Sequence, residues 1–207
     1  MSKETKHSRQ EQKAMTRQKI KEAVEQLIDS QAIANTKIGD ITKAAGIASG
    51  TFYVHFESKE EVLKEIFADF NTKVYEKIRP TIEAASEQPL EYTIETIAKV
   101  FLDFWLQNQG IVKIYAQIMQ DNVELDGLKN GVNPMAIQML SLALSNKAKA
   151  TKTPPRNWEL IAHAIASIWL RIGLQYLFGS GVTRADAVDT LTQLTLGSVN
   201  AVLNSDL

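Results

Sequence analysis

Apolar residues recur at intervals of three and four along most of this 207-residue chain. The first such segment contains Ile20, Val24 and Leu27, and the next runs from Val62 to Ile78. This spacing places the apolar side chains on one face of an α-helix, and no stretch alternates with period two for long enough to indicate a sheet. The pattern therefore predicts an all-α protein.

The same spacing returns in five later segments, at residues 94–105, 111–118, 135–143, 161–176 and 188–203. Gly- and Pro-containing breakers separate the segments, at Pro80, Pro89, Gly110, 126–134, 151–155 and 179–181. Because such residues interrupt helices, we expect about nine helices in all.

Charge is distributed unevenly along the chain. Residues 1–21 contain seven Lys or Arg and two Glu, a net charge of +5, whereas the whole chain carries −1. A basic end on an otherwise acidic protein favours a polyanion partner for that region alone. A merely solvated basic tail explains the charge equally well.

Composition excludes several classes of site. The chain has no Cys, so it has no disulfide, Cys nucleophile or thiolate metal site. It has three scattered His and lacks the H-E-x-x-H, G-x-S-x-G and phosphate-binding glycine motifs. We therefore expect no enzyme activity, no cofactor and no metal.

The longest apolar stretch, residues 160–178, is nearly long enough to span a bilayer, but it contains His163, Arg171 and Gln175. Such side chains are costly in hydrocarbon, which favours a buried helix over a membrane span. The first 18 residues contain no apolar run of signal-peptide length, so we expect a cytoplasmic protein.

The segment 38–56 has the pattern of a helix-turn-helix. Ile38, Ile41 and Ala45 are the apolar positions of one short helix, and Gly46 suits the left-handed turn that ends it. A second short helix is predicted from Ser49 to His55, with Phe52 and Phe56 facing the core. In this motif the second helix enters the major groove of DNA.

The remaining side chains of that second helix face outward in this prediction. Hydroxyl and imidazole groups contact phosphates and base edges, and glycine permits close backbone approach. The predicted DNA contacts are Arg17, Lys37, Ile38, Ser49, Gly50, Thr51, Tyr53, Val54, His55 and Lys59. Taken singly, each of these residues is equally typical of an ordinary solvated surface.

Ser58 and Glu61 have the spacing of a capping box, which predicts the start of a long helix. Lys59 falls in the first turn of that helix, where backbone N–H groups and the helix dipole favour phosphate. Arg17 and Lys21, in the first helix, are further candidates for phosphate contacts.

The run AAGIASGTFYVHFESKEEVL resembles the DNA-binding domain of the tetracycline-repressor (TetR) family. The matching residues are Ala44, Ala45, Gly46, Gly50, Thr51, Tyr53, His55, Phe56, Ser58, Lys59 and Glu60. Three positions depart from the family pattern: Gly39 replaces a longer polar residue, Thr42 an Ala, and Ala48 a capping Ser. These departures affect base reading more than the fold.

The resemblance implies a three-helix DNA-binding domain at residues 1–57 and a ligand-binding and dimerisation domain at 58–207, with the helix 58–78 bridging them. It implies a homodimer on double-stranded operator DNA, formed through helices at about 155–178 and 184–204, and release by a small-molecule effector. Large apolar residues become candidate walls of a pocket for that mostly apolar effector: Phe101, Phe104, Trp105, Tyr115, Met119, Met135, Met139, Trp158, with His163 as a polar group. Aromatic and Met residues at this spacing are also typical of plain core.

Two alternatives remain open for the function. A DNA-binding architectural protein without effector control would share the helix-turn-helix. A TetR-like activator would share the whole organisation of a repressor.

Overall fold

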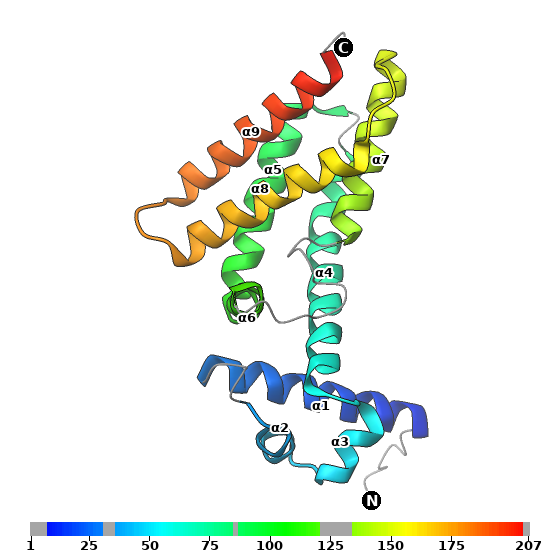
Figure 1. Ribbon diagram of the computed structural model, residues 1–207, viewed down its shortest axis with the longest axis vertical. Coiled ribbons are helices and arrows are strands. Elements are labelled where there is room, and N and C mark those ends of the chain that lie inside the picture. Colours follow the sequence, from blue (N-terminus) through cyan, green and yellow to red (C-terminus); the bar gives the residue numbers. More distant parts are fainter. Residues whose placement is uncertain (1–7, 31–35, 85–86, 121–133, 205–207) are drawn as a thin grey trace, which may run out of the picture. The chain divides into compact units, whose positions relative to one another are not determined.

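The computed structural model describes residues 8–30, 36–84, 87–120 and 134–204. Within these ranges the chain forms nine α-helices and no strand, as the periodicity predicted. The helices are α1 (Arg9–Ser30), α2 (Ile38–Ala45), α3 (Ser49–His55), α4 (Lys59–Glu83), α5 (Leu90–Gln107), α6 (Gln109–Gln120), α7 (Pro134–Thr151), α8 (Trp158–Phe178) and α9 (Arg184–Asn204) (Figure 1).

The chain divides into two compact units, residues 1–69 and 70–207. In the first unit α1 packs on α2 and α3, and these helices bury apolar side chains from their amphipathic faces. The fully buried large side chains include Ile20, Ile41, Phe52, Phe56 and Ile66. These buried residues fix the orientation of the short helices α2 and α3.

In the second unit α5 packs on α9 and α7 packs on α8. Helices α8 and α9 run antiparallel on either side of the turn at 179–183 (Figure 1). One core cluster contains Phe70, Phe104, Trp105, Val112 and Leu170. The domain boundary expected at residues 57 and 58 stays a prediction.

Two breakers act differently from the prediction. Helix α4 continues through Pro80 to Glu83, so the helix does not end at this proline. Pro80 lies in the last turn and its carbonyl still accepts a hydrogen bond from the Ala84 N–H at 3.1 Å. The break near Gly110 lies at Asn108, which caps α5, while Gly110 is inside the first turn of α6.

Helix α8 is long and apolar enough to span a membrane by length and composition alone. It packs instead against α5, α7 and α9 of the second unit. Its buried residues Ala162, Ile165, Leu170 and Gly173 follow one face of the helix. The helix therefore packs within the second unit through one face, whereas the sequence predicted a helix buried on more of its surface.

Candidate nucleic-acid interface

Helix α3 is positioned by a tight turn after α2. Gly46 adopts φ 67°, in the left-handed region, and the Ile47 N–H donates to the Thr42 carbonyl at 3.0 Å. A glycine adopts this conformation without steric cost, which explains why α2 ends here. Ala48 precedes α3 and provides no side-chain cap, so the sequence departure at this position leaves the first N–H groups of α3 without a capping side chain.

The two faces of α3 differ as predicted. Phe52 and Phe56 are buried, whereas Tyr53 and Val54 are 59% and 70% exposed. The rings of Phe52 and Tyr53 meet edge to face at 5.5 Å, which restrains the exposed tyrosine against a buried ring. Ser49 and Gly50 are exposed, and Thr51 and His55 are half-buried. The outward face of α3 thus combines hydroxyl groups, an apolar group and bare backbone.

The start of α4 has the predicted cap with one difference. The Ser58 Oγ accepts a hydrogen bond from the Glu61 N–H at 3.2 Å. The Glu61 carboxylate accepts from the Glu57 N–H at 2.6 Å, instead of from the N–H of Ser58 itself. Lys59 donates through Nζ to the Thr36 carbonyl at 3.2 Å, which holds its positive charge next to the segment before α2.

The start of α2 carries two other predicted contacts. Lys37 is exposed, and its N–H donates to the Asp40 carboxylate at 3.0 Å. Ile38 is half-buried, and Gly39 is exposed with no atom within 4 Å of the position that a Cβ would occupy. A side chain at residue 39 would therefore extend into open space, and glycine leaves this position without one.

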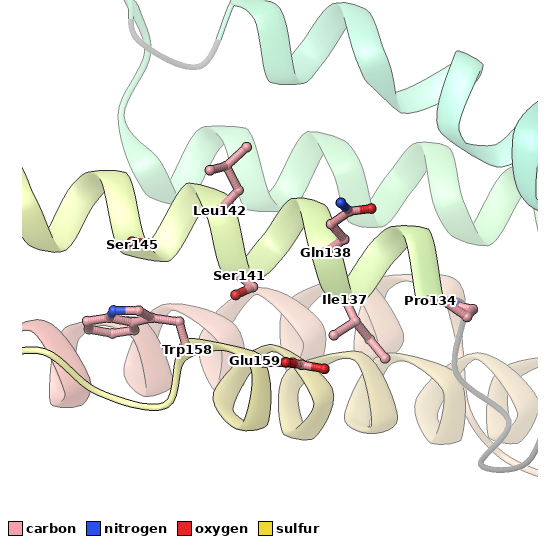
Figure 2. A pocket seen from close by; sticks show the side chains of 8 residues that line it. All are labelled: Pro134, Ile137, Gln138, Ser141, Leu142, Ser145, Trp158 and Glu159. Atoms are coloured by element: carbon pink, nitrogen blue, oxygen red, sulfur yellow. The ribbon is translucent and has the colours of Figure 1, made fainter.

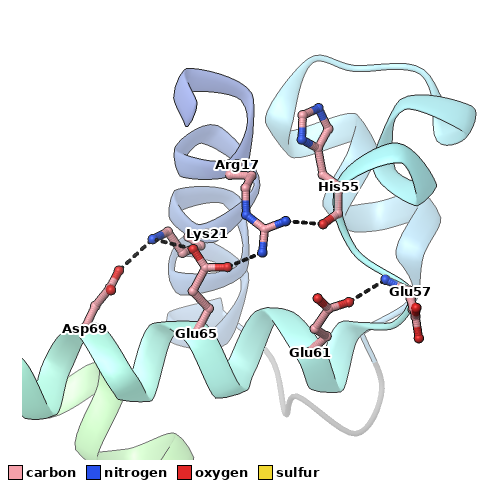
Figure 3. A network of polar contacts seen from close by, with 7 residues as sticks. All are labelled: Arg17, Lys21, His55, Glu57, Glu61, Glu65 and Asp69. Carbon is pink, nitrogen blue, oxygen red and sulfur yellow. Dashed lines mark hydrogen bonds and ion pairs between the residues drawn. The ribbon is translucent and has the colours of Figure 1, made fainter. Parts of the chain in front are cut away.

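Arg17 and Lys21 lie in a network with α4 (Figure 3). Arg17 donates to the backbone carbonyl of His55, the last residue of α3, and to the Glu65 carboxylate. Lys21 is only 8% exposed and donates to Glu65 at 3.3 Å and to Asp69 at 2.6 Å. Both cations, which the sequence suggested for phosphate, make contacts inside the protein.

Interactions within the network favour the charged forms of Glu65 and Lys21. Burial alone would raise the pKa of the Glu65 carboxyl, but hydrogen bonds from Arg17 and Lys21 outweigh burial and hold that pKa below its usual value. For Lys21, burial acts to lower the pKa, and the carboxylates of Asp69 and Glu65 raise it above the usual value.

His55 is the titratable group nearest the end of α3. Burial, followed by the positive charges of Lys13 and Arg17, lowers the pKa of its imidazole. Its Nδ1 is buried and has no hydrogen-bond partner among the described residues. A neutral imidazole still offers one N–H donor to a phosphate. Lys13 is exposed on α1 near this imidazole, and the sequence reasoning missed it as a candidate for a phosphate contact.

Four of the predicted effector residues lie in or against one core cluster, and the others lie elsewhere. Phe104 and Trp105 are buried in a core cluster, and Phe101 and Tyr115 pack against it. Burial raises the pKa of the Tyr115 phenol. Trp158 packs instead against the cluster that contains Leu144 and Ala162.

The other predicted effector residues lie on α6, α7 and α8. Met135 is exposed and Met139 half-buried, both on α7. His163 is half-buried on α8, and its carbonyl accepts from the Ser167 Oγ at 2.7 Å. Met119 lies outside the residues whose side chains the structure describes.

An open groove of about 520 Å³ lies between α7 and the start of α8 (Figure 2). Of the predicted effector residues, Trp158 lines it. Its other lining residues are Pro134, Ile137, Gln138, Ser141, Leu142, Ser145 and Glu159. Among residues 8–30, 36–84, 87–120 and 134–204, no group of three or more His, Asp or Glu is placed to hold a metal ion.

Comparison with known proteins agrees with this geometry. Residues 20–66 match the family described as "Bacterial regulatory proteins, tetR family". The chain is 37% identical over 67 residues to the HTH-type transcriptional regulator AcrR of Shigella flexneri, covering 32% of this chain and 29% of that protein. It is 30% identical over 80 residues to the HTH-type transcriptional repressor KstR2 of Mycolicibacterium smegmatis, covering 39% and 38% of the two chains. These matches span well under half the length of both relatives.

The likeness extends further in the fold. A structure from Syntrophomonas wolfei assigned to the TetR family superposes with a TM-score of 0.75 at 20% identity, covering 94% of this chain and 97% of that one. The TetR-family repressor FadR of Thermus thermophilus, in complex with lauroyl-CoA, gives a TM-score of 0.64 at 15% identity, covering 88% and 94%. With the helix-turn-helix of α2 and α3, these findings show that residues 20–66 form a DNA-binding domain of the TetR family of bacterial regulatory proteins, in a chain that shares the fold of TetR-family structures.

Proposed function

We propose that this protein is a transcription regulator that binds double-stranded operator DNA through α3. The observation that carries the proposal is the division of α3 into two faces, with Phe52 and Phe56 buried and Tyr53 and Val54 strongly exposed. A recognition helix needs this division, because the core must hold it rigidly while its other face reaches the groove. Ser49, Gly50 and Thr51 at its N-terminal end are the residues we assign to base edges.

Around α3 we assign the phosphate contacts to Lys37, Tyr53, His55 and Lys59, and we add Lys13. Tyr53 is exposed on α3 and its hydroxyl can donate to a phosphate oxygen. Lys59 lies in the first turn of α4, where the helix dipole also favours an anion. Together these donors would hold α3 in register on the duplex, while the base contacts carry the sequence preference.

We further propose that the regulator is a homodimer formed by α8 and α9. The proposed dimer surface consists of exposed residues on both helices. On α8 they are Leu160, Ala164 and Phe178, and on α9 they are Leu194 and Gly197. Exposed apolar groups on adjacent antiparallel helices favour burial against a second copy of the same surface. A dimer would also place two recognition helices on half-sites about one helical turn, roughly 34 Å, apart.

The effector we propose is small and mostly apolar, and the regulator is a repressor that the effector releases from DNA. The FadR neighbour holds lauroyl-CoA and the KstR2 relative is a repressor, which supports both parts. Helix α4 contributes Glu65 to the first unit and Phe70 to a core cluster of the second, so it is the element that an effector would act through. Release requires only that the effector bind the state without DNA affinity more tightly.

Selection of duplexes from a random library tests the function. Wild-type protein should enrich a palindromic sequence and prefer it to random DNA by roughly 10³ or more at physiological salt. Equal affinity for both would support a DNA-binding architectural protein instead.

Tyr53→Phe combined with Lys59→Ala should weaken binding to all sequences and leave the dimer mass unchanged in native mass spectrometry. Unaltered affinity for DNA would overturn the contact assignment.

The same mass spectra test the effector. A small molecule that stays bound during purification should appear as added mass on the protein. Such a bound molecule, or lauroyl-CoA added as a probe, should reduce the fraction of protein that is in complex with DNA. If transcription from the regulated promoter rises when the protein leaves the DNA, the protein is a repressor. If transcription rises only while the protein is bound, it is a TetR-like activator.

A further inference from the structure

The carbonyl at the end of α3 has an unusual partner. The last carbonyl groups of a helix accept no hydrogen bond from within the helix, and cations near that end stabilise it. Here the guanidinium of Arg17 supplies the donor to the His55 carbonyl, from a residue 38 positions away in the sequence. The same guanidinium lies over the Phe56 ring at 4.0 Å, so it contacts the residue that follows α3 as well.

The guanidinium is itself held by Glu65. The carboxylate accepts from Arg17 through one oxygen and from Lys21 through the other, the latter at 3.3 Å. Lys21 is held in turn by Asp69 at 2.6 Å (Figure 3). Arg17 and Glu65 are both about 30% exposed, so water screens their pair only in part.

We infer that Glu65 and Arg17 are positioning residues for DNA binding, with Glu65 orienting the guanidinium that caps α3. This inference rests on the proposed function. The planar fork of Arg17 can donate to the His55 carbonyl and to Glu65 at the same time, which a lysine ammonium at this position cannot reproduce in the same geometry. The alternative role for Arg17 is a direct phosphate contact.

The direction in which one substitution changes the affinity for DNA separates the two roles. Glu65→Gln removes one negative charge from the DNA-binding unit, and simple electrostatics would make binding to DNA tighter. If Glu65 positions the cap, the same substitution weakens binding. Glu22→Gln is the matched control, because Glu22 is an exposed carboxylate of α1 that accepts from the nearby Gln18 at 3.1 Å and lies outside the network.

Binding is measured by fluorescence anisotropy, with a duplex of about 30 base pairs enriched by the wild-type protein and a scrambled duplex for comparison. We expect Glu65→Gln and Arg17→Lys each to weaken binding to the enriched duplex roughly tenfold, as removal of one hydrogen bond to a charged group would. The dependence of affinity on salt should stay as in the wild type, because both variants still neutralise the same phosphates. Glu22→Gln should bind as tightly as the wild type or slightly tighter.

Amide hydrogen exchange of the DNA-free protein gives a second readout. In both network variants a peptide covering residues 49–56 should exchange several-fold faster, while a peptide from α5 exchanges as in the wild type. Circular dichroism at the assay temperature establishes that the variants are folded. A role limited to general stability would speed exchange in both peptides alike.

The outcomes separate this inference from the proposed function. Binding by Glu65→Gln that is equal to or tighter than the wild type overturns the inference, as does unchanged exchange in residues 49–56. An Arg17→Ala variant with a smaller salt slope would assign Arg17 to phosphate instead. If the wild-type protein enriches no duplex, the proposed function fails, and the exchange data alone decide whether Glu65 and Arg17 hold the end of α3.

Discussion

Helix α8 passes α5 so closely that it needs a glycine at residue 173. An ideal Cβ at Gly173 would lie 2.7 Å from Trp105 Cζ3, 2.9 Å from Trp105 Cε3 and 3.2 Å from Phe101 Cε1. Carbon atoms in contact prefer about 3.5–4.0 Å, so the buried indole would have to move by nearly an ångström. We therefore expect Gly173→Ala to destabilise the protein.

The size of the effect follows from two opposing terms. Overpacking a core costs roughly 1–3 kcal/mol. Replacing a glycine inside a helix by alanine contributes about 0.5–1 kcal/mol in the other direction. The net destabilisation is about 1–2 kcal/mol, which for a chain of this size lowers the melting temperature by roughly 3–6 °C.

Differential scanning calorimetry and urea unfolding followed by Trp fluorescence measure this destabilisation. Gly39→Ala is the control, since Gly39 also lies in a helix but has no atom within 4 Å of its Cβ position. That variant should be as stable as the wild type or more stable. The pair Gly173→Ala and Trp105→Phe should show a coupling of about 1 kcal/mol in a double-mutant cycle, because the smaller ring relieves the overlap. A Gly173→Ala protein as stable as the wild type would refute the reasoning.

Two further predictions concern the dimer and pH. Leu194→Glu places a charge on the apolar surface that we assign to the dimer, and sedimentation should then show monomers at micromolar concentration; a dimer as tight as the wild type would exclude α9 from the interface. Because the pKa of Glu65 is lowered in the folded protein, its contribution to stability is present above the usual glutamate pKa of about 4.3 and is lost as pH falls through the folded value. The difference in unfolding free energy between wild type and Glu65→Gln should therefore shrink in acid; a difference independent of pH from about 7 to about 3 would contradict this assignment.

Local signals predicted α2 and α3 well. The left-handed turn needs only Gly46, and the alternation of Phe52 and Phe56 with exposed neighbours is set by helical spacing within a few residues. The cap at Ser58 was predicted for the same reason, although the Glu61 carboxylate selects the N–H of Glu57. Each of these features depends on residues that are close together in the chain.

Features that depend on distant residues were not predictable in this way. Arg17 contacts His55 and Glu65, which are 38 and 48 residues away, and no local pattern records those distances. Pro80 has the sequence of a helix breaker, but in the last turn of α4 it forfeits a single backbone hydrogen bond and the helix continues to Glu83. Among the predicted pocket walls, Phe104 and Trp105 lie in one core cluster while Trp158 packs against another, because helical spacing identifies an apolar face without identifying what it packs against.

The basic charge at the N-terminal end now divides into two groups. Lys21 is buried and paired with carboxylates, whereas Lys13 is exposed on the same helix, eight residues earlier. Only an exposed cation can displace counterions from DNA, so a count of basic residues overestimates the salt dependence of binding.

This division gives a measurable contrast on one helix. Lys13→Ala should reduce the slope of log affinity against log salt by about 0.9 for each phosphate that the variant no longer neutralises, and it should weaken binding to enriched and scrambled duplexes alike. Lys21→Met keeps the buried aliphatic stem without its charge, and it should leave that slope unchanged while it lowers the melting temperature. The reverse pattern, with the slope changed by Lys21→Met and not by Lys13→Ala, would mean that the pairing of Lys21 with Glu65 and Asp69 gives way when the protein binds DNA.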